Sequence, residues 1–261
     1  MVTDRYYYHR FPEEKKRIYR AVYKGAKEGA PVVSLPGNEE MDTVMEVYNA
    51  VLLDNPMLYY LSRTVEVLKY SGAVCKTEIR MHYTLSRETI RDFDRRIEDG
   101  VNGLIEDLGL GKMRDRDAVK TLHDYLAAEM KYDSEALRDR KKGRLISAHS
   151  VIGFFSKQSA VCDGISSTVK LVLNALDIPC IVVAGSAAGE GDGGHAWNIV
   201  KIGEEAYHLD ITWDINMSTR DKICYDYYNI PDEAVRRDHK WPPGLPRCSS
   251  WKESLRVRRM N

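Results

Sequence analysis

Three residues in the second half of the chain have the types and the order needed for nucleophilic catalysis by a thiol. Cys162 begins a run with apolar residues on one face between Ile165 and Leu176, which predicts a helix. The unpaired amides and the dipole at a helix N-terminus favour negative charge, so they stabilise a thiolate. His195 and Asp210 follow on predicted strands. Cysteine, histidine and aspartate in this order could serve as nucleophile, base and orienting acid.

The connection between the two strands decides whether His195 and Asp210 share a face of the sheet. A two-residue turn at Gly203-Glu204, with glycine first as a type II′ turn prefers, places His195 opposite Thr212. Asp210 is then the diagonal neighbour of His195 on the same face. A three-residue loop would turn Asp210 to the other face. The turn residues therefore favour a His–Asp pair.

Composition limits the class of protein that could carry this chemistry. The 261 residues include 39 Lys+Arg against 39 Asp+Glu and are 43% hydrophobic, which is typical of a globular protein and argues against nucleic-acid binding. With no apolar stretch of membrane length and no secretory signal, we expect a cytoplasmic protein without membrane contact. Five cysteines without a Cys-x-x-Cys pair argue against a disulfide framework and a zinc ribbon.

The elements that must position the three residues divide into two predicted domains. Residues 1–110 are expected to form a small α+β domain of unknown role, and residues 111–261 the catalytic domain. The N-terminal pattern predicts helices that begin near Pro12, Met41 and Ser86, with short strands around Val65 and Ile79. The C-terminal pattern predicts helices over 119–130 and 162–176, and strands over 181–184, 195–202 and 206–214. His123, in the first of these helices, is expected to be a hydrogen-bonded structural histidine.

The run from residue 160 to 214 resembles the transglutaminase-like superfamily, in particular its bacterial members related to papain-like cysteine peptidases. The matching motifs are Val161-Cys162-Asp163-Gly164, Gly194-His195-Ala196-Trp197-Asn198 and Tyr207-His208-Leu209-Asp210-Ile211-Thr212-Trp213-Asp214. Further matches are Leu122-His123-Asp124-Tyr125-Leu126, and Tyr227 to Asp232 followed by His239 and Trp241. The resemblance covers roughly residues 115 to 250.

The resemblance implies an α+β fold of the papain/transglutaminase type, in which a cysteine-bearing helix packs on an antiparallel sheet. It implies that Cys162 is the nucleophile, His195 the general base and acid, and Asp210 the orienting residue. The reaction would be acyl transfer on a peptide or protein amide through a Cys thioester, as in a cysteine peptidase or a transglutaminase-like acyltransferase. We expect no metal and no cofactor. The resemblance does not decide whether the acyl group passes to water or to an amine, and the oligomeric state also stays open.

Three further residues are assigned roles on the same basis. The oxyanion is expected to bind the Cys162 backbone N–H and one more donor, for which Gln158 is the candidate, although a surface glutamine is at least as good an interpretation. Trp197 and Trp213 are candidates for the walls of the substrate cleft, and both could equally be core aromatics.

Two alternatives belong to other classes of protein. His195, His208 and Asp210 could imitate the two-histidine, one-carboxylate face of a non-haem iron enzyme, which would leave Cys162 without a role. The chain could also be a non-catalytic transglutaminase-like scaffold or binding module, since a fold does not guarantee a function. Such modules typically lose a triad residue, whereas here all three are present.

Overall fold

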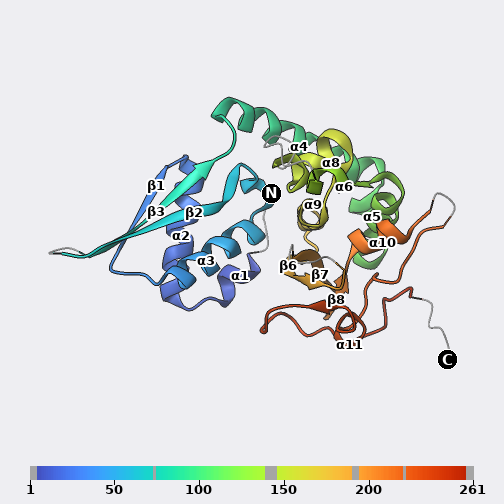
Figure 1. Cartoon of the computed structure of the whole chain (residues 1–261). Helices are drawn as coiled ribbons and strands as arrows, with labels where there is room; N and C mark the ends of the chain where they lie inside the picture. Colours follow the sequence, from blue (N-terminus) through green and yellow to red (C-terminus); the bar gives the residue numbers. More distant parts are fainter. Residues whose placement is uncertain (1–4, 73–74, 139–145, 190–193, 220–221, 257–261) are drawn as a thin grey trace. The chain divides into compact units, whose positions relative to one another are not determined.

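The computed structural model describes residues 5–72, 75–138, 146–189, 194–219 and 222–256, and the chain forms two compact units (Figure 1). One unit comprises Arg5–Asp94, and the other is described from Arg95 onward. The division falls inside helix α4 (Arg87–Asp107). The domain boundary between residues 110 and 111 stays a prediction. In the part of the chain that the structure describes, no helix has the length and apolar character required to cross a bilayer.

The N-terminal unit packs helices on a three-stranded antiparallel sheet. Its strands β1 (Val32–Pro36), β2 (Leu61–Tyr70) and β3 (Lys76–Tyr83) pair in the order β1-β3-β2. Its helices are α1 (Tyr6–Arg10), α2 (Glu13–Glu28) and α3 (Met41–Asp54), followed by the short 3-10 helix η1 (Pro56–Leu58). The helices predicted near Pro12 and Met41 and both predicted strands are confirmed. The edge strand β1 was not predicted.

The second unit contains a four-stranded antiparallel sheet in the order β8-β7-β6-β9. Its strands are β6 (Cys180–Ala187), β7 (His195–Ile202), β8 (Glu205–Leu209) and β9 (His239–Lys240). A separate parallel pair joins β4 (Lys131–Tyr132) to β5 (Ser159–Ala160). Besides the end of α4, the described helices are η2 (Leu110–Lys112), α5 (Asp115–Glu129), α6 (Ser134–Arg138), α8 (Val151–Lys157), α9 (Cys162–Ala175), α10 (Ile211–Met217) and α11 (Asp232–Val235).

Helix α9 packs against β6 and β7, which confirms the predicted arrangement of a cysteine-bearing helix on an antiparallel sheet (Figure 1). The apolar stripe of α9 that includes Ile165 and Val169 is buried. The Asn198 side-chain amide donates to the carbonyl oxygens of Ser166, at 2.9 Å, and Ile181, at 3.2 Å. Asn198 thus ties β7 to both the helix and the neighbouring strand.

The β7–β8 hairpin has the predicted two-residue turn. Ile202 pairs with Glu205, and Gly203 has φ of 60° while Glu204 has no positive φ, as a type II′ turn requires. The strand predicted to reach Asp214 is wrong beyond Leu209, because α10 begins at Ile211. The cause is local: the Asp210 side chain accepts a hydrogen bond from the Trp213 backbone N–H at 3.2 Å and caps the new helix.

Gly185 in β6 leaves no room for a side chain. A Cβ atom there would lie 2.2 Å from the Lys240 carbonyl oxygen and 2.7 Å from the Trp197 ring. We therefore expect Gly185→Ala to force β9 away from β6 and to lower the free energy of unfolding by about 1–3 kcal/mol, measured by urea denaturation.

Gly103→Ala in α4 is the matched control, because a Cβ there meets nothing within 4 Å. Alanine at this helical position should raise the free energy of unfolding by about 0.5–1 kcal/mol. Loss of stability of the same size in both variants would contradict the steric argument.

Candidate active site

Cys162 is the first residue of α9 and is partly exposed. The chain reaches it from β5, and the Val161 backbone N–H donates to the Ala148 carbonyl oxygen at 3.0 Å. The Ile165 backbone N–H donates to the Val161 carbonyl oxygen at 2.9 Å and so closes the first turn of the helix. The structure thus places the thiol at the positive end of the α9 dipole, as the apolar stripe predicts.

The two residues after Cys162 build this helix start. The Asp163 carboxylate accepts from the Gly164 backbone N–H at 2.9 Å and lies 2.8 Å from His149 Nδ1. A Cβ on Gly164 would lie 2.4 Å from the Ala148 carbonyl oxygen, so only glycine allows this close packing. The motif around the cysteine is therefore needed for the local backbone as well as for any chemistry.

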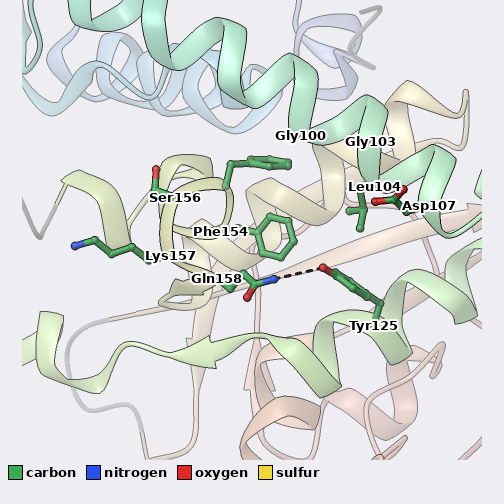
Figure 2. Close-up of a pocket in the computed structure, with 10 residues that line it drawn as sticks. Gly100, Gly103, Leu104, Asp107, Tyr125, Phe154, Ser156, Lys157 and Gln158 are labelled. Atoms are coloured by element: carbon green, nitrogen blue, oxygen red, sulfur yellow. Dashed lines mark hydrogen bonds between the residues drawn. The ribbon is translucent and has the colours of Figure 1, made fainter.

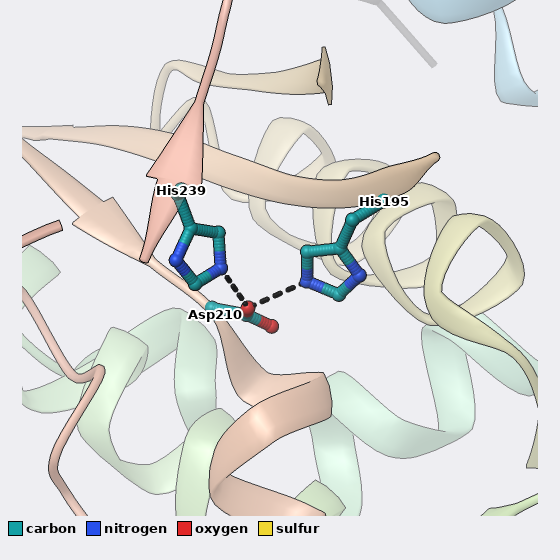
Figure 3. Close-up of side chains that lie close together, drawn as sticks. All are labelled: His195, Asp210 and His239. Carbon is teal, nitrogen blue, oxygen red and sulfur yellow. Dashed lines mark hydrogen bonds and ion pairs between the residues drawn. The ribbon is translucent and has the colours of Figure 1, made fainter. Parts of the chain in front are cut away.

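His195 and Asp210 lie in direct contact, on the same face of the sheet (Figure 3). His195 Nε2 is 2.7 Å from Asp210 Oδ2, and both residues are buried. This is the contact that the hairpin register predicts. When Nε2 donates its proton to the carboxylate, Nδ1 carries the lone pair. Nδ1 is buried and has no hydrogen-bond partner among the described residues, so it is the nitrogen that could accept a proton.

A second histidine, His239, binds the same carboxylate, and sequence reasoning gave it no role. His239 Nε2 lies 3.0 Å from Asp210 Oδ2 (Figure 3). Burial alone would raise the pKa of Asp210, but the hydrogen bonds from the two imidazoles hold it below its ordinary value. His239 comes from β9, a two-residue strand too short for any periodicity, and the only sequence signal was its place in the resemblance to the superfamily.

Trp197 lies in the core behind His195 and does not form an open cleft wall. Its side chain is 1% exposed, its ring stacks on the His195 ring with centroids 5.7 Å apart, and its Nε1–H donates to His208 Nδ1 at 3.0 Å. Trp213 is partly exposed, with its ring centroid 6.1 Å from that of His195. Of the two tryptophans predicted to line the cleft, the structure leaves only Trp213 with accessible surface at this site.

Gln158 ends α8 with a left-handed backbone conformation, φ of 49°, and its side chain is exposed. Its amide nitrogen lies 3.4 Å from the Tyr125 hydroxyl, at the edge of a cavity of about 530 Å³ (Figure 2). Residues of α4, α5 and α8 line this cavity, among them Gly103 and Phe154. Four residues of chain can span at most about 14 Å, which is the upper limit on the separation of the Gln158 and Cys162 Cα atoms. The oxyanion role of Gln158 stays a prediction.

Among the residues that the structure describes, two clusters contain residue types that bind metals, and hydrogen bonds explain both. In the first, formed by His195, Asp210 and His239, both nitrogen–oxygen distances are those of hydrogen bonds to one carboxylate oxygen. In the second, formed by His208, Asp232 and Cys248, His208 Nδ1 accepts the indole N–H of Trp197. Its Nε2 must then carry the ring proton, which it donates to Asp232 at 2.9 Å, and it offers no lone pair to a metal.

This hydrogen bonding also separates the residues of the iron-site alternative. Both ring nitrogens of His208 face Trp197 and Asp232, whereas His195 Nε2 faces Asp210. The structure therefore does not bring His195, His208 and Asp210 together as one ligand set.

His123 is a hydrogen-bonded structural histidine, as predicted. Its Nδ1 lies 3.1 Å from Asp124 Oδ1 and its Nε2 lies 3.1 Å from Asp214 Oδ2. Burial alone would lower the pKa of His123, but the two carboxylates raise it above its ordinary value. Asp214 also accepts the Tyr227 backbone N–H at 3.0 Å, so this pair joins α5 to α10 and to the following loop.

Three buried histidines predict an optimum of stability near pH 6.5, their ordinary pKa. The pKa values of His123 and His239 are raised by their carboxylate partners against the effect of burial, so above pH 6.5 the unfolded state loses protons that the folded state keeps. Burial lowers the pKa of His208, so just below pH 6.5 the unfolded state gains a proton that the folded state does not bind. The free energy of unfolding should fall on both sides, measured by urea denaturation between pH 5.5 and 8.5.

His239→Gln should flatten the decline on the alkaline side, because it removes one of the two groups responsible for it. A free energy of unfolding that rises steadily from pH 6.5 to 8.5 would show that these histidines are not held as imidazolium ions.

Comparison with known proteins agrees with this geometry over the part of the chain that carries it. Residues 103–213 match the family model of the transglutaminase-like superfamily, and no curated protein matches the chain. The match ends three residues after Asp210 and contains Cys162 and His195.

Three solved structures are similar to the chain at low identity. A protein named as a TGase is 20% identical over 78% of this chain and 58% of its own, with a TM-score of 0.42. A candidate cysteine protease from Cytophaga hutchinsonii is 13% identical over 58% of this chain and 63% of its own, with a TM-score of 0.34. A candidate protease from Parabacteroides distasonis is 12% identical over 56% of this chain and 35% of its own, with a TM-score of 0.33.

The chain spans less than two thirds of the length of each of these structures. The family model, in contrast, coincides with the cysteine helix and the hairpin that carry the candidate residues. Over residues 103–213, the chain is therefore similar to the transglutaminase-like superfamily.

Proposed function

We propose that this protein catalyses thiol-dependent acyl transfer on a peptide or protein amide, with Cys162 as the nucleophile, His195 as the general base and acid, and Asp210 as the orienting residue. The observation that supports it is the orientation of His195. Its Nε2 is held 2.7 Å from Asp210, and its Nδ1 has no hydrogen-bond partner among the described residues. His195 lies on β7, in the sheet against which the cysteine helix packs.

The first half of the reaction forms a thioester. His195 Nδ1 takes the thiol proton, and the Cys162 sulfur attacks the amide carbonyl carbon to give a tetrahedral oxyanion. The carbon–nitrogen bond then breaks, and His195 gives the proton to the leaving amine. Asp210 holds the imidazole in the Nε2–H tautomer and stabilises the imidazolium that forms between these two proton transfers.

The second half releases the acyl group. A water molecule or an amine attacks the thioester carbon and gives its proton to His195, and the carbon–sulfur bond breaks to restore the Cys162 thiolate. The acceptor alone decides whether the result is hydrolysis or amide transfer. A peptidase and a transglutaminase-like acyltransferase therefore share every step up to the thioester.

The oxyanion requires donors near the start of α9. We assign the backbone N–H of Cys162 as one donor, because the first amides of a helix point away from the helix toward bound negative charge. Gln158 is the proposed second donor. To act, its side-chain amide would leave the weak contact with Tyr125, a 3.4 Å separation at the edge of the cavity.

Cys162 should be the fastest-reacting thiol of the five in alkylation at neutral pH, and its rate should fall only at pH values well below the ordinary thiol pKa of about 8.5. Buried Cys180 is shielded, and burial raises the pKa of Cys224 to about 11 and that of Cys248 further. Rates of iodoacetamide labelling measured against pH, with sites read by peptide mass spectrometry, check this.

Exposed Cys75 is the internal control for accessibility. Faster labelling of Cys75 than of Cys162 at pH 6 would mean that exposure alone sets the rates. That result would favour the non-catalytic scaffold over an enzyme.

Asp210→Asn should reduce the rate of acyl transfer roughly 10³- to 10⁴-fold, because asparagine presents an amide donor to a ring nitrogen that must itself donate. The measurement is acylation of Cys162 by an acyl-ester probe, followed by mass spectrometry. His195→Ala should cost at least as much, since it removes the base.

Asp232→Asn is the matched control, because Asp232 also binds a buried histidine, His208, at 2.9 Å. It makes the same chemical change at a pair that the mechanism does not use, and the acylation rate should stay within a few-fold of that of the unmodified protein. Equal loss of rate in both variants would point to general destabilisation.

A further inference from the structure

His239 lies on the side of Asp210 away from His195, and the reaction proposed above does not use it. Figure 3 shows the two rings on either side of the carboxylate, each directing a nitrogen at the same oxygen atom. His239 is 2% exposed. It lies on the edge strand β9, where it pairs with Ala187 of β6. The ring is therefore a fixed part of the site's interior.

Both ring nitrogens of His239 face carboxylate oxygens. Nε2 is 3.0 Å from Asp210 Oδ2, and Nδ1 is 2.6 Å from Asp238 Oδ1. An ionised carboxylate only accepts hydrogen bonds, so each nitrogen must carry a proton and the ring is an imidazolium. The Tyr227 hydroxyl donates to the other oxygen of Asp238, so both oxygens of this carboxylate act as acceptors.

We infer that His239 is a positioning residue for acyl transfer: it fixes the Asp210 carboxylate by a second hydrogen bond and offsets part of its negative charge. The inference rests on the proposed function, in which Asp210 orients His195. The ring centroids of His239 and His195 are 5.3 Å apart, so the imidazolium charge acts directly on the catalytic base.

This charge matters because His195 must release the proton it accepts. A buried carboxylate alone would bind the His195 imidazolium strongly and slow proton transfer to the leaving amine. The positive charge of His239 weakens this attraction between the carboxylate and the His195 imidazolium. His239 also prevents the carboxylate from turning away from His195, because Oδ1 of Asp210 is bound to the Trp213 backbone N–H and Oδ2 to both rings.

The surroundings of His239 keep it charged near neutral pH. Among the described residues, the charged and titratable groups that face it from the elements packed on it are Asp210, Asp238, His195, His208 and Tyr227. Two of these are carboxylates in hydrogen-bond contact, whereas His208 is held neutral by the indole N–H at its Nδ1. The carboxylates raise the pKa of His239 although burial would lower it.

The test is titration of the histidine side chains in the full-length protein by ¹⁵N NMR, with each ring assigned by its loss in a single variant. In the unmodified protein, His239 should hold protons on both nitrogens at pH 7.5. In His239→Gln, which keeps an N–H donor without the charge, the titration midpoint of His195 should rise by about one pH unit. His239→Leu, which also removes the donor, should slow acylation of Cys162 roughly tenfold or more.

His208→Gln is the matched control, because it makes the same substitution at a buried but neutral histidine on β8, in the hairpin that carries His195. It should leave the midpoint of His195 unchanged. A singly protonated His239 at pH 7.5, or an unchanged midpoint in His239→Gln, would overturn the inference. If His239→Gln does not fold, the number of protons on the His239 ring at pH 7.5 in the unmodified protein still tests the inference.

The proposed function is tested separately in the same samples by Cys162 alkylation. A slow, ordinary thiol at Cys162 together with a doubly protonated His239 would reject the enzyme and leave the charge assignment standing. A fast, acidic Cys162 with an unchanged His195 midpoint would reject only the role of His239.

Discussion

The buried carboxylate of Asp210 is the constraint on which the second unit depends. A carboxylate that is 2% exposed is stable as an ion only when hydrogen bonds replace its water. The donors come from three places: His195 on β7, His239 on β9 and the first turn of α10. The hairpin, the short edge strand and the helix after the hairpin must therefore all be in place for this one charge to be satisfied.

Much of this arrangement could be predicted from sequence, because it is encoded by local chemistry. The apolar stripe after Cys162 gave the start of α9, and glycine at the first turn position gave the register that brings His195 and Asp210 to one face. The strand past Leu209 was wrong because the cap formed by Asp210 outweighs the β propensity of the next residues. His239 was missed because a two-residue strand is positioned by tertiary pairing alone.

The site also shows how hydrogen-bond partners set the charge of a buried histidine. His123 and His239 each lie between two carboxylates, which raise the pKa of both rings against the effect of burial. His208 lies between a carboxylate and an indole N–H, and the indole fixes it as a neutral ring. Burial is similar in all three, so the difference arises from the partner atoms. Such assignments need the structure, since sequence does not show which donors face a ring.

The cap that Asp210 provides for α10 has a consequence for how this fold could change during evolution. Replacing Cys162, a partly exposed thiol, would remove the proposed nucleophile. Replacing Asp210 would leave two imidazoles and a helix amide without an acceptor. A related protein that had lost catalysis and served only as a scaffold would therefore keep Asp210 long after losing Cys162. Among the three residues, the cysteine is the informative marker of a working enzyme.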